Sequence, residues 1–211
     1  MLGECSEHGY YRGEKCPICG EEGKFVMNDW EIRKLSGTMI GILRHFPEQF
    51  EVEMDEKGWV DMGEMADAIK RRRKDFHWLR VKHIRAIAET DEKGRYQVEG
   101  KKIRATYAHT IDVDLSDLPP ADVDELFYPV TEEEVEIVLE QGLFPIDRNK
   151  VHLSGSVEKA MEAGKIRTEN PVILCIDAAK AMEDGITILR AGRDVYIADE
   201  IDAKYLSRYK A

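Results

Sequence analysis

The sequence predicts an α+β protein in which two lobes follow a short cysteine-rich segment. Residues 1–27 contain three of the four cysteines, residues 28–111 mix helical and strand patterns, and residues 126–211 are dominated by short strands. Residues 112–125 contain two adjacent prolines and six acids without a basic residue. Such a composition is typical of an exposed connection, so it predicts a linker between the lobes.

Composition excludes several classes of protein. Of the 211 residues, 43% are hydrophobic and 35% charged, and the net charge of −11 argues against coating nucleic acid by bulk charge. The longest apolar run, 171–176, falls far short of the roughly 20 residues of a membrane span. The amino terminus lacks the basic-then-apolar order of a signal peptide. We therefore expect a cytoplasmic protein without a membrane partner, whose cysteines are metal ligands or core thiols.

The first 20 residues contain a candidate metal site. Cys5 and His8 are separated by two residues, as are Cys16 and Cys19 in a Cys-Pro-Ile-Cys-Gly stretch that resembles a zinc knuckle. These four side chains predict a closed tetrahedral Cys3His zinc site with a structural role. The alternative is a set of free surface thiols beside a chance histidine. Cys175 lies in an apolar run and is expected to be a core thiol.

Residues 28–111 predict a helix, a short strand, two helices and a hairpin. From residue 28 to about 50, apolar residues recur at three- and four-residue spacing, which predicts a helix. Pro47 should end that helix. Asp61 is expected to cap a second helix, to about residue 74, after a short strand at 59–60. The other expected elements are a helix at 79–89 and a hairpin over 95–107. This order is typical of a winged-helix domain.

The carboxyl-terminal half predicts a small mixed α+β domain. Helical patterns cover 133–141 and 157–163. The expected strands are 150–154, 171–176, 187–190 and 195–197.

A basic island interrupts the acidic chain. Residues 70–104 hold 13 Lys or Arg and five acids, a net +8, so the other residues carry −19. An island of this kind is typical of a local polyanion site, although a solvated helix face is the alternative. The uninterrupted run from Lys70 to Lys74 favours nucleic acid.

Three arginines and a histidine are candidates for phosphate chemistry. The chain lacks the glycine-rich nucleotide loops, the His-Glu-x-x-His zinc motif and the Gly-x-Ser-x-Gly nucleophile motif. Arg44 and His45 end the first predicted helix, where a favourable helix dipole is an alternative explanation. Arg104 lies in the hairpin, and Arg167 precedes a strand. A guanidinium matches a phosphate dianion with two parallel hydrogen bonds and stays charged at any working pH.

These residues fall in segments that resemble the RNA 2′-phosphotransferase family. The match covers the chain from about residue 30 to its end in five ordered segments. The segments are Leu35-Ser36 through Ile42-Leu43-Arg44-His45, Gly58-Trp59-Val60, Ile103-Arg104-Ala105 with His109, Val151-His152-Leu153-Ser154, and Arg167 with Pro171-Val-Ile-Leu.

The resemblance implies a winged-helix lobe followed by a lobe of the ADP-ribosyltransferase type. It also implies NAD-dependent removal of an internal 2′-phosphate from RNA, a tRNA splice junction being the family's substrate. An ADP-ribosylated RNA is the intermediate, and nicotinamide and ADP-ribose cyclic phosphate are released. By resemblance, the catalytic positions are Arg44, His45, Arg104 and Arg167, and the NAD-binding positions are His109, Thr131, His152 and Ser154.

The chain departs from the family pattern at two places. Tyr128-Pro129-Val130-Thr131 replaces a frequent Tyr-His-Gly-Thr run, and Ala108 replaces a usual glycine before His109. Two other functions stay open: an ADP-ribosyltransferase acting on another target, such as a terminal RNA phosphate, and a non-catalytic winged-helix protein with a zinc knuckle. The second accounts for the basic island and the cysteines but not for Arg167.

Overall fold

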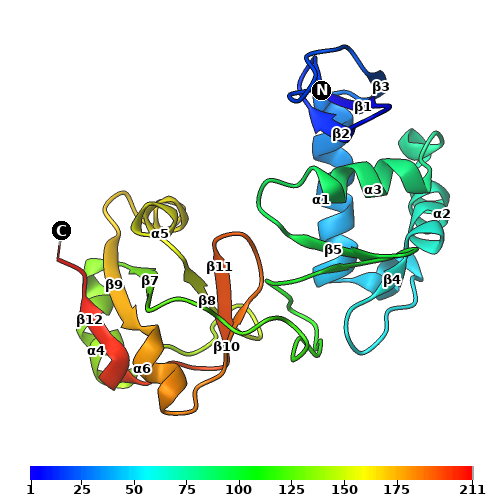
Figure 1. Cartoon of the computed structure of the whole chain (residues 1–211). Helices are drawn as coiled ribbons and strands as arrows, with labels where there is room; N and C mark the ends of the chain where they lie inside the picture. The colour runs from blue at the N-terminus through cyan, green and yellow to red at the C-terminus, as the bar shows by residue number, and fades with distance from the viewer. Residues whose placement is uncertain (211) are drawn as a thin grey trace. The chain divides into compact units, whose positions relative to one another are not determined.

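The computed structural model describes residues 1–210, which form helices and antiparallel sheets in two compact units (Figure 1). Unit 1 comprises Met1–Thr106 and Ile111–Asp114. Unit 2 comprises Tyr107–Thr110 and the chain from Leu115 onward. The predicted mixture of helices and short strands is therefore confirmed.

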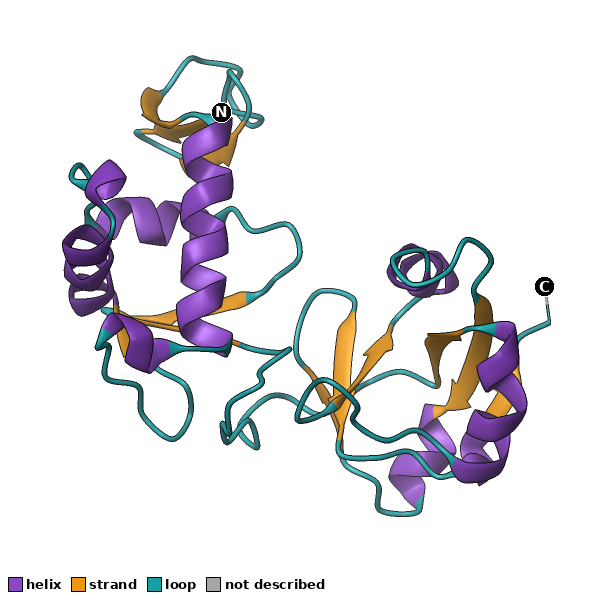
Figure 2. Ribbon diagram, turned by 180° about the vertical axis from the view of Figure 1, so that it is seen from behind, coloured by secondary structure: helices purple, strands orange, loops and turns teal. Residues whose placement is uncertain are grey.

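Unit 1 begins with a small antiparallel sheet that the sequence patterns did not predict. Its strands are β1 (Leu2–Cys5), β2 (Gly9–Arg12) and β3 (Lys24–Met27), in the order β2-β1-β3. Figure 2 shows these strands at the amino-terminal end of the long helix α1. Leu2 and Met27 are fully buried in the main core of unit 1. The cysteine-rich segment is thus packed into the same compact unit as the helices that follow it.

Helix α1 (Asp29–Arg44) starts and stops where its sequence dictates. The Asn28 side chain accepts a hydrogen bond from the Glu31 N–H, and the Glu31 carboxylate accepts one from the Asn28 N–H, both 2.9 Å long. This reciprocal cap satisfies two N–H groups that the helix itself leaves without partners. The α-helix ends before Pro47, as predicted, and a 3-10 helix, η1 (Pro47–Phe50), follows.

The rest of unit 1 has the predicted order of elements. They are β4 (Val60–Asp61), α2 (Met62–Arg72), the 3-10 helix η2 (Lys74–Phe76), α3 (Val81–Glu89), β5 (Tyr96–Glu99) and β6 (Lys102–Ala105). The strands form an antiparallel sheet in the order β4-β6-β5. Asp61 caps α2 as expected, since its Oδ1 accepts hydrogen bonds from the N–H groups of Gly63 (2.7 Å) and Glu64 (3.1 Å).

Unit 2 is built on a six-stranded antiparallel sheet in the order β10-β11-β8-β7-β9-β12. The strands are β7 (Glu125–Val130), β8 (Val151–Ser154), β9 (Val172–Asp177), β10 (Ile188–Arg190), β11 (Val195–Ala198) and β12 (Leu206–Arg208). The helices are η3 (Glu132–Glu134), α4 (Val135–Gln141), α5 (Val157–Gly164), α6 (Ala178–Glu183) and η4 (Ala203–Tyr205). The sequence patterns missed β7, β12 and α6.

Side chains along β7 and β9 point alternately to the two faces of the sheet, and each face has its own apolar cluster. Phe127 and Ile173 pack with Ala160 of α5 on one face of the sheet. Leu126 and Ile176, which are register partners, belong to a second cluster that includes side chains of α4 and α6. Successive side chains of a strand point to opposite faces, so helices cover the sheet on both sides (Figure 1).

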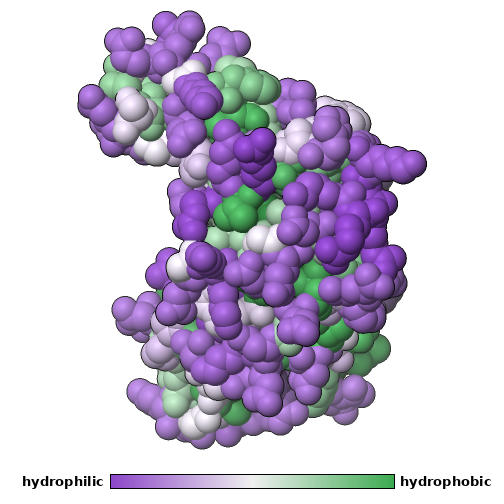
Figure 3. Space-filling view, turned by 90° about the vertical axis from the view of Figure 1, so that its right-hand side faces the viewer, coloured by the Kyte–Doolittle hydropathy of each residue, from purple (hydrophilic) through white to green (hydrophobic). Residues whose placement is uncertain are grey.

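The exposed surface is mostly polar, as the 35% of charged residues leads one to expect. The face shown in Figure 3 is mostly hydrophilic, with apolar side chains reaching the surface in small patches. Among residues 1–210, no helix is long and apolar enough to cross a membrane.

Candidate active site

Arg44 and His45 lie at the carboxyl-terminal end of α1. The Arg44 side chain is buried, and its positive charge opposes the burial that raises the pKa of Tyr96 on β5. The His45 N–H donates to the Gly41 carbonyl at 3.1 Å, which closes the last turn of the helix. The His45 ring lies 6.1 Å from that of Phe46, measured between centroids. The helix end therefore holds a buried cation next to an imidazole.

Arg104 is one of the largest fully buried side chains of unit 1. It lies on β6, with 2% of its surface exposed. Its Nε donates to Gln97 Oε1 at 2.8 Å and its Nη1 to the Lys57 carbonyl at 3.2 Å. The guanidinium carbon lies 4.6 Å from the centroid of the Trp59 ring. Two hydrogen bonds and a cation–π contact thus fix the orientation of this guanidinium.

Arg104 and Arg44 come from adjacent elements, because α1 packs against β6 within unit 1. The sequence placed both arginines in one lobe but gave no reason for their elements to touch. Trp59 and Gln97, which position Arg104, were not among the predicted site residues, although Trp59 lies in one of the segments that resemble the family.

Arg167 in unit 2 is held by a carboxylate. Its Nη2 lies 2.5 Å from Glu134 Oε1, and the other oxygen of Glu134 accepts a hydrogen bond from the Thr131 N–H at 2.9 Å. Burial alone would raise the pKa of Glu134, but the hydrogen bonds from Thr131 and Arg167 outweigh it and lower that pKa. The structure therefore brings two predicted site residues, Thr131 and Arg167, together through Glu134.

Sequence reasoning missed Glu134. The signal that could have found it is the Thr-x-x-Glu pattern of a helix cap, which predicts a hydrogen bond between the Glu134 carboxylate and the Thr131 N–H. The partnership with Arg167 spans 33 residues and has no such local signal.

A pocket of about 250 Å³ lies beside Arg167. Tyr128, Val138 and Leu143 contribute to its largely apolar wall. Burial raises the pKa of Tyr128, so its phenol stays neutral at working pH. The pocket joins an apolar surface to the Arg167–Glu134 ion pair, so its lining offers both a ring-sized apolar wall and charged groups to a ligand.

A second group of predicted residues meets around Ala108. The Ala108 N–H donates to His152 Nε2 at 2.9 Å, and its carbonyl accepts from Arg148 Nη1 at 2.9 Å. Ala108 has a φ of 64°, the left-handed region that glycine enters without steric cost. Buried His109 follows, and its carbonyl accepts from the Asn149 N–H at 3.2 Å. The predicted residues His109 and His152 are therefore brought together by backbone hydrogen bonds.

Ser154 lies two residues after His152 on β8. Both side chains are half-buried, whereas Val151 and Leu153 are buried, so His152 and Ser154 share one face of the strand. Ser154 is the register partner of Phe127, which places it near α5 on that face.

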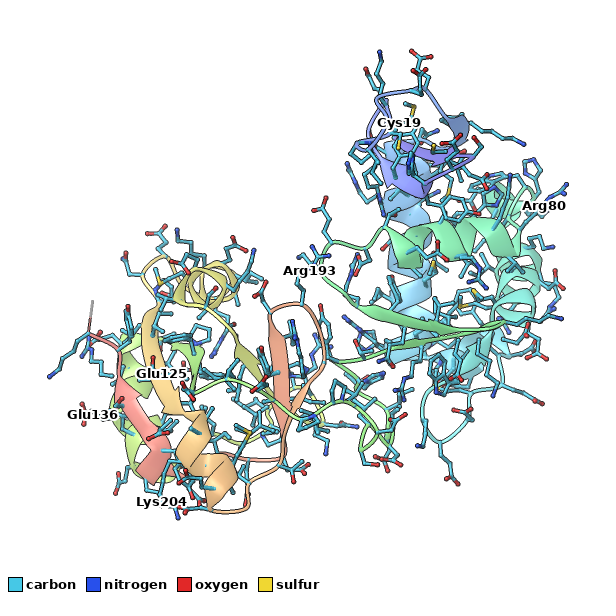
Figure 4. The ribbon with its side chains drawn as sticks, viewed as in Figure 1. Cys19, Arg80, Glu125, Glu136, Arg193 and Lys204 are labelled. Atoms are coloured by element: carbon cyan, nitrogen blue, oxygen red, sulfur yellow. The ribbon has the colours of Figure 1, made fainter. Side chains whose placement is uncertain are left out.

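The four predicted metal ligands converge in unit 1. The ligand atoms of Cys5, His8, Cys16 and Cys19 all lie within 4.8 Å of one another, so the cluster could hold a metal ion. Figure 4 shows Cys19 beside other sulfur atoms of the amino-terminal segment. Hydrogen bonds from backbone N–H groups, that of Cys19 foremost, lower the pKa of Cys16 to about 6. A thiolate is the form in which cysteine binds metals.

The basic run at 70–74 is partly neutralised by neighbouring acids. Lys70 pairs with Asp67 at 2.6 Å, and Arg72 lies 3.4 Å from Glu51. Arg80, just beyond the run, points away from the ribbon in Figure 4. Exposed pairs of this kind are weak, so they leave the side chains able to exchange partners.

Comparison with known proteins assigns the chain to a class and then to a family. Its relatives are transferases. The model of the family described as "RNA 2'-phosphotransferase, Tpt1 / KptA family" matches residues 31–200, and the chain belongs to this family.

Three relatives show how far the similarity extends. A protein of Archaeoglobus fulgidus named "Probable RNA 2'-phosphotransferase 1" is 48% identical over 204 residues, covering 97% of this chain and 93% of its own length. A "Probable RNA 2'-phosphotransferase" of Methanosarcina barkeri is 44% identical over 98% of both chains. One of Thermoplasma acidophilum is 42% identical, over 94% of this chain and 85% of its own. These matches cover nearly the whole chain, whereas the family model begins at residue 31.

Proposed function

We propose that this protein removes an internal 2′-phosphate from RNA, with a tRNA splice junction as the expected substrate and NAD as co-substrate. The observation that carries the proposal is Arg104, a buried guanidinium fixed by Gln97, Lys57 and Trp59 in a chain of this family. A cation that is already oriented before substrate binds is suited to a phosphate whose charge changes during reaction.

The reaction has two steps. In the first, an oxygen of the RNA 2′-phosphate attacks the anomeric carbon of the nicotinamide ribose, and nicotinamide leaves. In the second, the neighbouring ribose hydroxyl gives up its proton and attacks the same phosphorus. The RNA 2′-oxygen leaves and takes a proton, and ADP-ribose cyclic phosphate forms. The nucleophile of the first step is already an anion, so this step needs no general base.

The residues of unit 1 are proposed to serve the phosphate. Arg44 and Arg104 bind its oxygens, and His45 supplies the proton that the departing RNA oxygen needs. Arg167 of unit 2 binds phosphate by exchanging its partner Glu134 for a substrate oxygen. Thr131 acts through Glu134, which its N–H holds in place.

The residues of unit 2 fit a nucleotide co-substrate. His152 and Ser154 present polar groups on one half-buried strand face, and the His109 segment is fixed against them. We propose that these three residues, together with Thr131, bind NAD, that unit 2 is an ADP-ribosyltransferase-like lobe, and that α1 to β6 of unit 1 form a winged-helix lobe for RNA.

The metal of the cysteine cluster is proposed to be zinc. A tetrahedral ion with Zn–S of about 2.3 Å and Zn–N of about 2.0 Å requires S···S edges of about 3.8 Å and S···N edges of about 3.5 Å. Cys5 Sγ lies 3.8 Å from Cys19 Sγ, and His8 Nδ1 lies 3.4 Å from Cys5 Sγ and 3.6 Å from Cys16 Sγ. Thiolate ligands and an RNA substrate both suit the cytoplasm.

Nicotinamide release tests the proposal. We expect the protein to release nicotinamide from NAD when given RNA with an internal 2′-phosphate, and not when given the same RNA without it. Release with a terminal phosphate alone would favour the other ADP-ribosyltransferase function. RNA binding without any release would favour the non-catalytic protein.

A further inference from the structure

A groove of about 510 Å³ runs along one side of α1 in unit 1. Trp30, Arg33, Lys34 and Gly37 line it from positions separated by three and four residues, which share one face of a helix. Phe46, Phe50 and Arg73 also line it. None of these residues belongs to the proposed catalytic set.

The groove offers aromatic surface to a ligand. The Trp30 side chain is 58% exposed, and the rings of Phe46 and Phe50 stack with centroids 6.5 Å apart. The absence of a side chain at Gly41 lets Phe46 lie against α1, because a Cβ there would come within 2.6 Å of its ring. The Phe46 ring lies 6.1 Å from the His45 ring, measured between centroids, so this end of the groove is near the proposed catalytic histidine.

The groove is also basic. Arg33, Lys34 and Arg73 line it, and the facing carboxylate is Asp75, which lies 2.6 Å from Lys34 and 3.4 Å from Arg73. Three cations against one anion leave a net positive surface. The Lys34 ammonium lies 4.4 Å from the centroid of the Trp30 ring, so charge and aromatic surface are adjacent.

Gly37 leaves the backbone of α1 open on the side of the groove. It lies in the middle of α1, where glycine destabilises a helix relative to alanine. A Cβ at this position would have no heavy atom within 4 Å, so packing within the protein does not require a glycine. The missing side chain leaves room for a ligand to approach the backbone closely.

We propose that this groove binds the single-stranded RNA next to the 2′-phosphate, with a base stacked on Trp30 and backbone phosphates on Arg33 and Arg73. Aromatic platforms with adjacent cations bind unpaired nucleotides without reading their sequence. An apolar protein segment would use neither the cations nor the flat ring. This inference rests on the proposed function, which supplies the 2′-phosphorylated RNA.

The test measures the binding of a fluorescent single-stranded RNA with one internal 2′-phosphate to the full chain, without NAD. Trp30→Leu keeps apolar surface but removes stacking, and we expect affinity to fall by about five- to hundredfold. Trp30→Phe should stay within about threefold, since stacking survives. Phe25→Leu is the matched control, because Phe25 is 57% exposed outside the groove; it should bind like the parent.

Two further variants examine the backbone and the charge. Gly37→Ala should raise the thermal unfolding midpoint and yet weaken RNA binding, which a purely structural role would not do. Arg33→Gln should reduce the slope of log affinity against log salt by about 0.7.

The outcomes separate this proposal from the proposed function. Parental affinity in Trp30→Leu, or no binding of single-stranded RNA by the parent, overturns the groove even if nicotinamide is released. Binding that depends on Trp30, without nicotinamide release on any 2′-phosphorylated RNA, supports the groove and overturns the enzyme.

Discussion

The two units hold their candidate phosphate-binding arginines in opposite ways. In unit 1, Arg104 is 2% exposed and Arg44 8%, whereas the Arg167 side chain of unit 2 is 48% exposed and paired with Glu134. The Arg104 guanidinium, which two hydrogen bonds and the Trp59 contact hold, has lost much of its freedom before substrate arrives. An exposed pair contributes about 0–1 kcal/mol, so Arg167 can change partner at little cost. The difference suggests a fixed phosphate site in one unit and an adjustable cation in the other.

Replacing Arg104 and Arg167 by lysine should reveal the contrast between the two arginines most strongly. We expect Arg104→Lys to lower the single-turnover rate by about 10³-fold or more, because one ammonium cannot keep the two hydrogen bonds and the Trp59 contact together. Arg167→Lys should cost about tenfold, since an exposed ammonium can still reach an anion. Rapid-quench assays with saturating NAD measure both rates.

Arg95→Lys is the control for Arg104→Lys. Arg95 lies next to the same hairpin but pairs with Asp91, so its replacement should leave the rate unchanged. Equal losses in Arg104→Lys and Arg167→Lys would contradict the distinction between fixed and adjustable cations.

His45→Ala should separate the two chemical steps. We expect RNA carrying a 2′-phospho-ADP-ribosyl group to accumulate, because an RNA alkoxide leaves poorly without a proton donor, and the second step should slow by about 10² to 10⁴. Arg167→Ala should slow formation of that species as well. Gel separation of end-labelled RNA detects it. Dephosphorylation at the parental rate without the intermediate would exclude this role for His45.

The elements predicted from sequence are those with local signals. Asn28, Asp61 and Pro47 start or stop helices through contacts within a few residues, so periodicity and caps predicted α1 and α2. Strand β7 was missed because Pro129 is atypical of a sheet interior. The structure accommodates Pro129 because β8 pairs with β7 at Phe127, and Pro129 lies beyond that point.

The candidate site likewise contains residues that the sequence could identify and residues that it could not. The family resemblance singled out the arginines, and paired spacing identified the metal ligands, which the structure brings together. The partners that hold the site were not predictable, since Trp59 meets Arg104, Glu134 meets Arg167 and Ala108 meets His152 through long-range packing.

Loss of the metal should affect the stability of unit 1 more than the chemistry. Cys16→Ser with Cys19→Ser should abolish the roughly one zinc per chain expected by elemental analysis. We expect unit 1 to lose more than about 3 kcal/mol of stability, because Leu2 and Met27 next to the cluster belong to its core. The chemical step should change by less than about tenfold. Cys175→Ser is the control, and absence of metal in the parent would contradict the zinc site.

Acid should weaken unit 1 through His83. Burial, with Lys82 and Arg80 nearby, lowers the pKa of His83 to about 4, and its Nδ1 accepts a hydrogen bond from the Arg80 N–H. The unfolded chain has the higher pKa, about 6.5, so this stability is complete above pH 6.5 and is lost as the pH falls to about 4. The loss should reach about 3 kcal/mol at most.

Urea unfolding between pH 8 and 4 measures this loss. His83→Gln should flatten the pH dependence, whereas His77→Gln, at an exposed position, should keep it. The same slope in the parent and in His83→Gln would assign the acid sensitivity to other groups.

The fate of a radiolabelled 2′-phosphate distinguishes NAD-dependent transfer of the phosphate from its simple hydrolysis. RNA with the label at one internal 2′-phosphate is incubated with the protein, with and without NAD, and the products are separated. We predict that the label leaves the RNA only with NAD and migrates with ADP-ribose, while the RNA keeps an unmodified 2′-hydroxyl. Release of the label as inorganic phosphate, or release without NAD, would contradict the account.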